Sequence, residues 1–493
     1  MLAKLLEARR RGGMEAELPW LLRGMGVELG MGAPFERALA RAGQGNSQLA
    51  CEFKIAFWEI SSGGSSAQDA LARLGARAGS LPIKRAVAEL VHCYENGGNG
   101  DGLKRLAAEL VLEQKAKAKE FAARASLLGL AFMACSCIVP SLFLALSIVG
   151  SSFMGAIFTP LQIWLFFLAG FPLLGAGIIG FSWLITPAGL IAGDGGGVFG
   201  ECEIRHVDAL LKAKGMRAGI RQLALPCLSL SSLLGLSAYF GLEWLGMEFT
   251  ARTAGALILF LSPFLAYFYL SGLVRARGAR MEKFLPDALF QASSMQNGAG
   301  FERIVASIAR SGYGPLSEEF ASAHRQMRAG VGVVPSLEGI ALRSDSLLVR
   351  RSVGLLAQAY CTGAEMGGAL RDAAQDAFEA SSELWERKGM LAVQRYTALF
   401  SGFLVPIILG MIAGTVAGLG SFEIEGMGAS PVERAGLLSA SLGAAQAYIA
   451  IFALLASVFA SMQGGEWKKF VLYFAILAPL GLALFGAARA YSI

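Results

Sequence analysis

Seven stretches of mainly apolar residues, each about 20 residues long, limit the possible folds of this chain more than any other feature. Such a stretch can cross a bilayer as a helix, because a helix bonds its backbone polar groups within itself. The composition agrees, since 55% of the residues are hydrophobic and only 16% are charged. We predict an all-α, polytopic membrane protein with about seven transmembrane helices. The predicted spans are Ala125 to Gly150, Leu161 to Thr186, Leu223 to Leu245, Thr253 to Val274, Tyr396 to Gly420, Gly436 to Met462 and Phe470 to Ala488.

The short connections between these spans predict how the chain is oriented in the membrane. Basic residues gather in the connection at 187–222 and recur as Lys468 and Lys469, and such residues favour the cytoplasmic side. The connections at 151–160 and 421–433 are uncharged and acidic, respectively. We therefore expect a multi-pass protein of the cytoplasmic membrane, in contact with membrane lipid, with a cytoplasmic N-terminus and an external C-terminus.

The sequence also contains an internal repeat. A shift of 266 residues places Phe35-Glu36-Arg37 on Phe301-Glu302-Arg303, and Pro140 on Pro406. A constant offset that covers a polar region and the following membrane helix indicates duplication. We predict two duplicated cytoplasmic helical bundles at 1–124 and 275–395, transmembrane pairs at 125–186 and 223–274, a cytoplasmic linker at 187–222, and three final transmembrane helices at 396–493.

Each polar region has the pattern of a bundle of about six helices, with apolar residues at three- and four-residue spacing. Gly43 and Gly97 are candidates for left-handed helix ends, and Ser66 and Pro82 are typical of helix starts. No turn signal precedes the span after either bundle, so the last helix of each is expected to continue into the membrane. The predicted helices are 15–30, 34–42, 49–60, 66–78, 82–95 and one from 101, then 287–297, 301–310, 316–329, 336–343, 346–361 and 366–396.

Glycines recur every four residues on one face of the fifth span, at Gly410, Gly414 and Gly418. Small residues at this spacing let another helix backbone approach closely. The face predicts a helix-packing seam, which is also a candidate contact for a homodimer.

Motifs for catalysis, cofactor binding and metal binding are absent from the sequence. There is no phosphate-binding loop and no His-Glu-x-x-His motif, and His92, His206 and His324 are isolated. The span centres carry no ionisable residue, which disfavours a transporter. A net charge of +6 gives no reason to expect a nucleic-acid partner. We expect a protein that is not an enzyme and has no cofactor or metal.

A glycine-rich turn precedes the last helix of each bundle. Together with the repeat and the spans, these turns resemble the F-type proteins of type II secretion and type IV pilus assembly. This PilC/GspF-like family includes archaellum (FlaJ-like) and Tad-like forms with two tandem F domains. The first copy departs from the family motif at Asn99, where an acidic residue is expected. The motif positions are Gly97 and Gly102 in the first copy, and Gly363, Glu365, Gly367 and Gly368 in the second.

The resemblance implies a non-enzymatic platform of an archaellum, pilus or secretion machine. Such a platform contacts a hexameric cytoplasmic ATPase and couples its motion to the extraction and assembly of pilin-like subunits. The basic pairs Lys84-Arg85 and Arg350-Arg351 are our candidates for the ATPase contact, because complementary charges on two partners raise the association rate and fix the register of the complex. Two alternatives stay open: a transporter or channel, and a membrane-anchored adaptor for another cytoplasmic partner.

Overall fold

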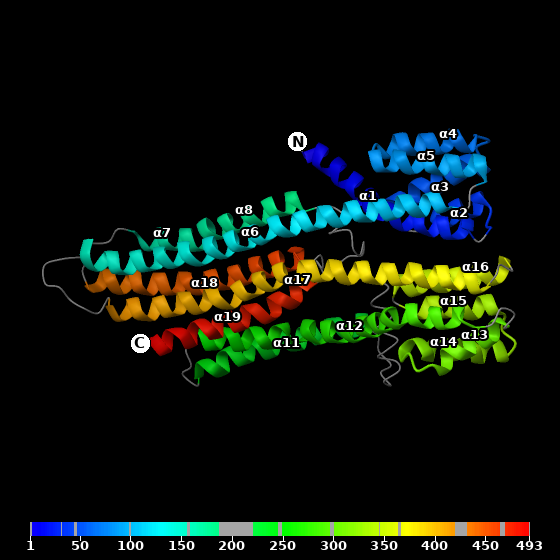
Figure 1. The fold of residues 1–493 in the computed structure, drawn as a ribbon. Coiled ribbons are helices and arrows are strands. Elements are labelled where there is room, and N and C mark those ends of the chain that lie inside the picture. Colours follow the sequence, from blue (N-terminus) through cyan, green and yellow to red (C-terminus); the bar gives the residue numbers. More distant parts are fainter. Residues whose placement is uncertain are drawn as a thin grey trace. The chain divides into compact units, whose positions relative to one another are not determined.

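The computed structural model describes residues 2–30, 32–43, 47–97, 100–154, 158–186, 220–244, 249–295, 300–344, 346–362, 366–419, 431–463 and 469–492. Every secondary-structure element within these residues is a helix, which confirms the predicted all-α fold (Figure 1). The chain forms two compact units. The first contains the described parts of Met1–Lys119 and Ser271–Arg387, and the second those of Glu120–Thr186, Gly196–Leu270 and Lys388–Ile493.

The first bundle lies in the first unit and ends where a long helix begins. Ser66 caps its fourth helix by accepting a hydrogen bond from the Asp69 N–H at 3.1 Å, and Gly97 ends the fifth with a φ of +58°, as predicted. The prediction for Gly43 is wrong, since its φ is −78°. A glycine is needed there for close approach instead, because a Cβ would lie 2.9 Å from the Lys54 Cα. The elements are α1 (Leu2–Gly30), α2 (Phe35–Ala42), α3 (Gln48–Ser61), α4 (Ala67–Ala78), α5 (Leu81–Asn96) and α6 (Asp101–Met154).

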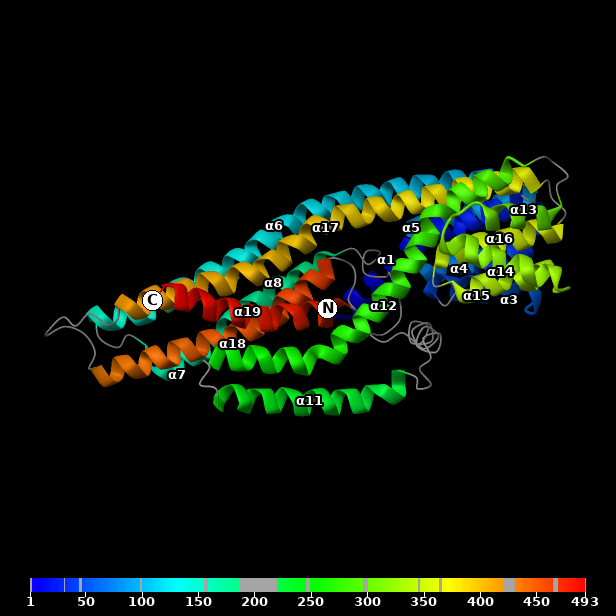
Figure 2. The same ribbon diagram turned by 90° about the horizontal axis from the view of Figure 1, so that it is seen from below.

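The second bundle, also in the first unit, repeats this order with one difference from the prediction. The expected helix at 287–297 is not separate but forms the end of α12 (Phe249–Ser293), which Figure 2 shows as one continuous helix. The residues before it, RARGARMEKFL, are mostly good helix formers, so nothing ends the helix there. The other elements are α13 (Phe301–Arg310), α14 (Pro315–Arg328), α15 (Val333–Arg343), α16 (Leu347–Thr362) and α17 (Met366–Leu419).

Both bundles bury equivalent residues in their cores. Phe53 in α3 and Phe320 in α14 are each only 1% exposed. An edge-to-face pair of Phe35 and Tyr94, with ring centroids 5.2 Å apart, has its counterpart in Phe301 and Tyr360 at 5.3 Å. Each pair therefore joins the second helix of a bundle to the fifth, and the sequence repeat is also a repeat of packing.

The second unit contains the apolar helices. Six helices of the described residues are long and apolar enough to span a membrane, and each coincides with a predicted span. The predicted span Leu223 to Leu245 falls on the helix α11 (Ile220–Trp244), which is not among the six and stays a predicted span. The candidate spans are Asp101–Gly150, Pro160–Ile185, Phe249–Ser293, Ala392–Val416, Ala435–Gln463 and Phe470–Tyr491.

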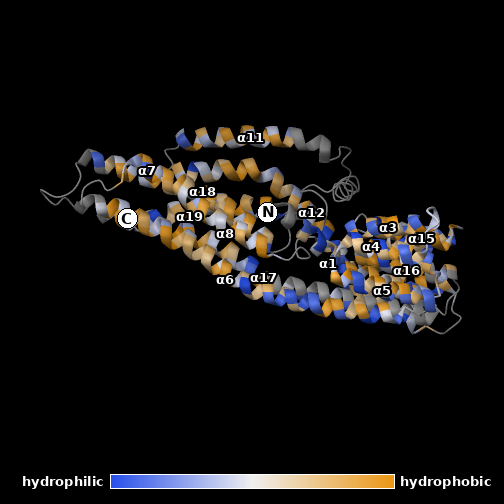
Figure 3. Ribbon diagram, turned by 90° about the horizontal axis from the view of Figure 1, so that it is seen from above, coloured by the Kyte–Doolittle hydropathy of each residue, from blue (hydrophilic) through white to orange (hydrophobic). Residues whose placement is uncertain are grey.

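The helices of the second unit are more hydrophobic than those of the bundles. Figure 3 shows mainly hydrophobic residues along α8 (Phe171–Ile185) and α18 (Pro431–Gln463), and a mixture along the bundle helices. The expected continuity also holds, because α6 and α17 each join a charged first part to an apolar last part without a break. The remaining elements are α7 (Pro160–Leu165), the π-helix η1 (Phe166–Gly170) and α19 (Phe470–Ser492).

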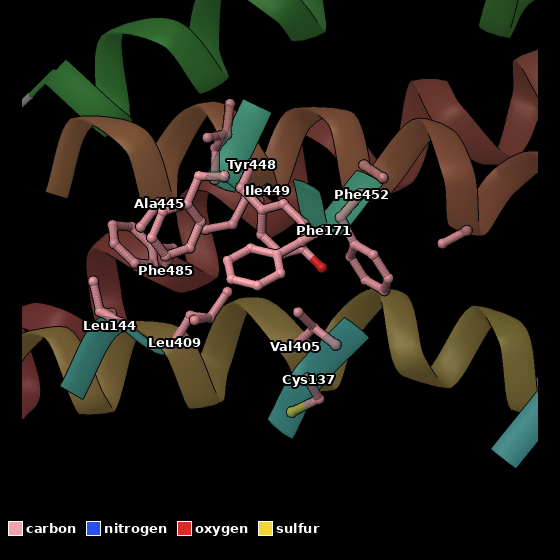
Figure 4. Packing of buried hydrophobic residues seen from close by; sticks show 14 of the residues in the cluster. Cys137, Leu144, Phe171, Val405, Leu409, Ala445, Tyr448, Ile449, Phe452 and Phe485 are labelled. Atoms are coloured by element: carbon pink, nitrogen blue, oxygen red, sulfur yellow. The ribbon is translucent and has the colours of Figure 1, made fainter. Parts of the chain in front are cut away.

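The core of the second unit lies around α18. Figure 4 shows Tyr448, Ile449 and Phe452 of α18 on the side that faces Val405 and Leu409 of α17. Tyr448 is 1% exposed, and its hydroxyl donates a hydrogen bond to the Ser136 carbonyl at 2.9 Å. This carbonyl lies four residues before Pro140, which has no N–H to donate. Tyr448 thus satisfies a backbone acceptor that the proline leaves without its helical donor.

Candidate functional site

The first bundle holds a buried carboxylate between two arginines. Glu52, on α3, has a side chain only 9% exposed. Its Oε2 accepts a hydrogen bond from Arg77 Nε at 2.8 Å, and its Oε1 lies 3.4 Å from Arg10 NH2. Because a buried charge is costly without a partner, these contacts fix α1, α3 and α4 relative to one another.

The second bundle contains the same arrangement. Glu319, on α14, is 10% exposed and accepts from Arg343 Nε at 2.7 Å and from Arg277 NH2 at 3.1 Å. The same glutamate oxygens face the equivalent arginines in both copies. We call each set a clamp: the first is Arg10, Glu52 and Arg77, and the second is Arg277, Glu319 and Arg343.

A second polar contact is repeated beside each clamp. The buried Ser80 hydroxyl donates to Glu15 Oε1 at 2.6 Å in the first bundle. The buried Ser346 hydroxyl donates to Glu282 Oε1 at 2.7 Å in the second. Duplication has therefore kept polar contacts as well as apolar cores.

Charge pairs also lower the pKa of two carboxyl groups in this unit. Burial acts to raise the pKa of Glu59, but hydrogen bonds and charges from Arg73 and Arg77 outweigh it and lower the pKa. The hydrogen bond from Lys115 lowers the pKa of Glu386. Such groups stabilise the folded state above the ordinary carboxyl pKa, and this contribution is lost as the pH falls through their lowered pKa.

The two bundles contact each other within the first unit, and we call this the bundle contact. Arg23 of α1, whose side chain is 10% exposed, lies 2.9 Å from Glu379 of α17. Trp20, one turn earlier on α1, packs against the core of the second bundle. Arg41 of α2 donates to the Gly354 carbonyl of α16 at 3.2 Å. The first bundle thus offers α1 and α2, and the second offers α16 and α17.

The basic pairs singled out in the sequence lie at equivalent places on α5 and α16. Lys84, Arg350 and Arg351 are exposed. Arg85 forms an ion pair with Glu109 at 2.8 Å, and Arg350 donates to the Ser344 carbonyl at 3.4 Å. Arg85 therefore already has an acidic neighbour, whereas Lys84 and Arg350 present their charges on the bundle surfaces.

The glycine turn of the first bundle forms a close backbone contact. Gly100 has a φ of +73°, and a Cβ on it would lie 2.5 Å from the Gly26 carbonyl oxygen of α1. Gly102, in the first turn of α6, lies against the Glu89 side chain. In the second copy, Gly367 and Gly368 lie in the first turn of α17, and Gly363 and Glu365 are outside the described residues.

The predicted seam on α17 is a contact within the chain at its first glycine. A Cβ on Gly410 would lie 2.7 Å from the Phe485 carbonyl oxygen of α19, so the two helices pack closely here. Gly414 is buried, and Gly418 is exposed. A homodimer contact stays a prediction, for which only the exposed end of this face is suited.

The clamps and the bundle contact were missed at the sequence level. A lone glutamate in an amphipathic helix has the pattern of a solvent-exposed residue, so Glu52 and Glu319 gave no signal by themselves. The repeat could have revealed the clamps, because each member recurs at nearly the same offset. Arg77 and Arg343 are 266 residues apart, and the other equivalent clamp members are 267 apart. Chemically, the clamps order helices and provide no nucleophile. Within the described ranges, no group of three or more His, Cys, Asp or Glu is placed to hold a metal ion.

Comparison with known families gives one match. The family model of type II secretion system (T2SS), protein F matches residues 21–147 and 291–414, slightly more than half of the chain. Each match begins in or near the first helix of a bundle and ends in the apolar part of α6 or α17. Searches of curated proteins and of solved structures give no match.

Proposed function

The chain belongs to the type II secretion system protein F family, and from this premise we propose that it couples a cytoplasmic hexameric ATPase to the handling of pilin-like subunits. Proteins of this family are the non-catalytic membrane platforms of type II secretion and type IV pili. The observation that carries the proposal is the double family match, which coincides with the duplicated bundles and the membrane helix after each. Two charged helical bundles, each continued by a membrane helix, are suited to transmit force.

The ATPase contact that we propose lies on α5 and α16. Lys84 and Arg350 occupy equivalent exposed positions, so a partner with repeated acidic surfaces can meet both. Arg85 is less suited, because its charge is shared with Glu109 and Glu113 at 2.8 and 3.7 Å. Arg351 is exposed beside Arg350 and belongs to the same surface.

Binding of the cognate ATPase to the full-length protein in lipid nanodiscs tests this contact. The double variant Lys84→Glu/Arg350→Glu is expected to weaken binding about tenfold at low salt, and less at high salt where charges are screened. Lys54→Glu/Arg328→Glu changes the net charge equally at other exposed positions and serves as the control. Equal losses in the two variants, or no binding by the wild type, would contradict the proposed contact.

We further propose that the N-terminus and both bundles are cytoplasmic and that the C-terminus is external. Cysteine labelling in a cysteine-free background tests this orientation at two exposed positions. Tyr491→Cys, at a side chain 94% exposed near the C-terminus, is expected to react with an impermeant maleimide in intact cells. Ala329→Cys in the second bundle should react only after permeabilisation. The reverse pattern would invert the orientation.

A further inference from the structure

The bundle contact is formed by different surfaces of the two copies. The first bundle contributes Trp20, Arg23 and Arg41 from α1 and α2. The second contributes Glu379 and the Gly354 carbonyl from α17 and α16. The two bundles are equivalent but use unlike surfaces for this contact. Each bundle therefore keeps one surface that is not used, although the equivalent surface of the other bundle is.

The counterpart surface on the first bundle is found by the repeat. A shift of 266 residues places Gly354 on Ala88, Gln375 on Glu109 and Glu379 on Glu113. We call Ala88, Glu109 and Glu113 the α5–α6 face. Ala88 is exposed, and the side chains of Glu109 and Glu113 are 53% and 44% exposed. The structure thus presents, open to solvent, the same surface that the second bundle uses to hold α1.

Glu113 is the acceptor on this face that a partner can reach. Arg85 NH2 lies 2.8 Å from Glu109, but Arg85 NH1 lies 3.7 Å from Glu113, beyond hydrogen-bond distance. In the second bundle, the equivalent Glu379 accepts from Gln375 at 2.8 Å and from Arg23 of α1 at 2.9 Å. The occupied copy therefore shows what the open one lacks, an arginine from outside the bundle.

We propose that the α5–α6 face of the first bundle binds an arginine-bearing amphipathic helix of another protein, as the second bundle binds α1. The template is α1, which places Trp20 and Arg23 three residues apart on one face and so combines an apolar anchor with a charge. The proposal depends on the repeat and the bundle contact, and it stands whether or not an ATPase binds Lys84 and Arg350.

A second copy of this chain does not fit the α5–α6 face. Its own α1 and α2 are engaged by its second bundle through Arg23 and Arg41. The equivalent surface of its second bundle carries Phe290 and Ser307 at the positions of these arginines, so it does not reproduce the contacts that Arg23 and Arg41 make. We therefore assign the α5–α6 face to a different protein.

Photo-crosslinking of the full-length protein in membranes of its own cells tests this proposal. A photoreactive residue at position 88 leaves Glu113 in place, and one at the exposed position 54 on α3 is the control site. The position-88 adduct, sequenced by mass spectrometry, is expected to contain an arginine-bearing helical segment of another protein. Glu113→Arg should reduce this adduct about tenfold, and Glu36→Arg, at an exposed position on α2, should not.

A charge exchange completes the test. Changing the arginine of the captured segment to glutamate should restore the adduct in the Glu113→Arg protein, which a general loss of folding would not allow. An adduct with lipid or with this same chain would overturn the proposal. The same holds for an adduct that Glu113→Arg does not change, or for none that exceeds the control at position 54.

Discussion

Replacing Gly100 by alanine is expected to destabilise the full-length protein by roughly 3 kcal/mol, far more than the same change at Gly97. Both glycines have a positive φ, +73° and +58°, which an alanine adopts at a cost of about 1 kcal/mol. At Gly100 the added Cβ would also lie 2.5 Å from the Gly26 carbonyl oxygen, so the backbone of α1 or of the turn must move. At Gly97 no described atom lies within 4 Å of that Cβ.

Gly26→Ala separates this steric explanation from helix propensity. Gly26 lies inside α1, where alanine is favoured by about 1 kcal/mol over glycine. A Cβ there would lie 2.9 Å from the Gly100 carbonyl oxygen and the Lys104 Cγ, so we expect a loss of stability instead of a gain. Thermal unfolding in detergent, followed by circular dichroism, measures all three variants. A stabilised Gly26→Ala protein, or equal losses at Gly97 and Gly100, would contradict the close contact.

The outcome at these glycines shows which features local sequence can predict. Helix boundaries followed from apolar spacing and capping residues, as at Ser66 and Gly97, because these signals act within a few residues. Gly26 carries no such signal, since its requirement comes from Gly100 at a distant place in the chain. The error at Gly43 has the same origin, because its close neighbour is α3 and not its own helix end. Contacts between helices are therefore the part of the fold that the pattern leaves undetermined.

The membrane part shows a similar division. Length and hydropathy predicted the six spans found in the described residues, and the seventh predicted span falls on the helix α11. The pairing of Tyr448 with the carbonyl freed by Pro140 could not be predicted, because it joins α18 to α6 across the core. Among the candidate site residues, the positions of Lys84 and Arg350 followed from the repeat, but the ion pair of Arg85 did not.

Removing the carboxylate of the second clamp is expected to be the most destabilising change to a charged residue in the bundles. In Glu319→Ala, Arg277 and Arg343 lose the 10% exposed acceptor that joins α12, α14 and α15. Arg343 then loses its carboxylate at 2.7 Å, and Arg277 keeps only the weaker contact with Glu318, which is 72% exposed and 3.5 Å away. Removing the partner of a buried charge costs several kcal/mol, and because these arginines are 45% and 39% exposed we expect roughly 2 to 3 kcal/mol. Thermal unfolding of the full-length protein in detergent measures the loss.

Two matched variants identify the cause of that loss. Glu318→Ala removes the neighbouring carboxylate, which is 72% exposed and 3.5 Å from Arg277, and should cost less than about 0.5 kcal/mol. Glu52→Ala breaks the first clamp, but Arg77 keeps Glu59 at 2.9 Å, so we expect a smaller loss than for Glu319→Ala. If Glu318→Ala and Glu319→Ala were equally mild, the second clamp would not order its bundle. If Glu52→Ala cost as much as Glu319→Ala, the contact with Glu59 would not compensate Arg77, and the two copies would depend on their clamps equally.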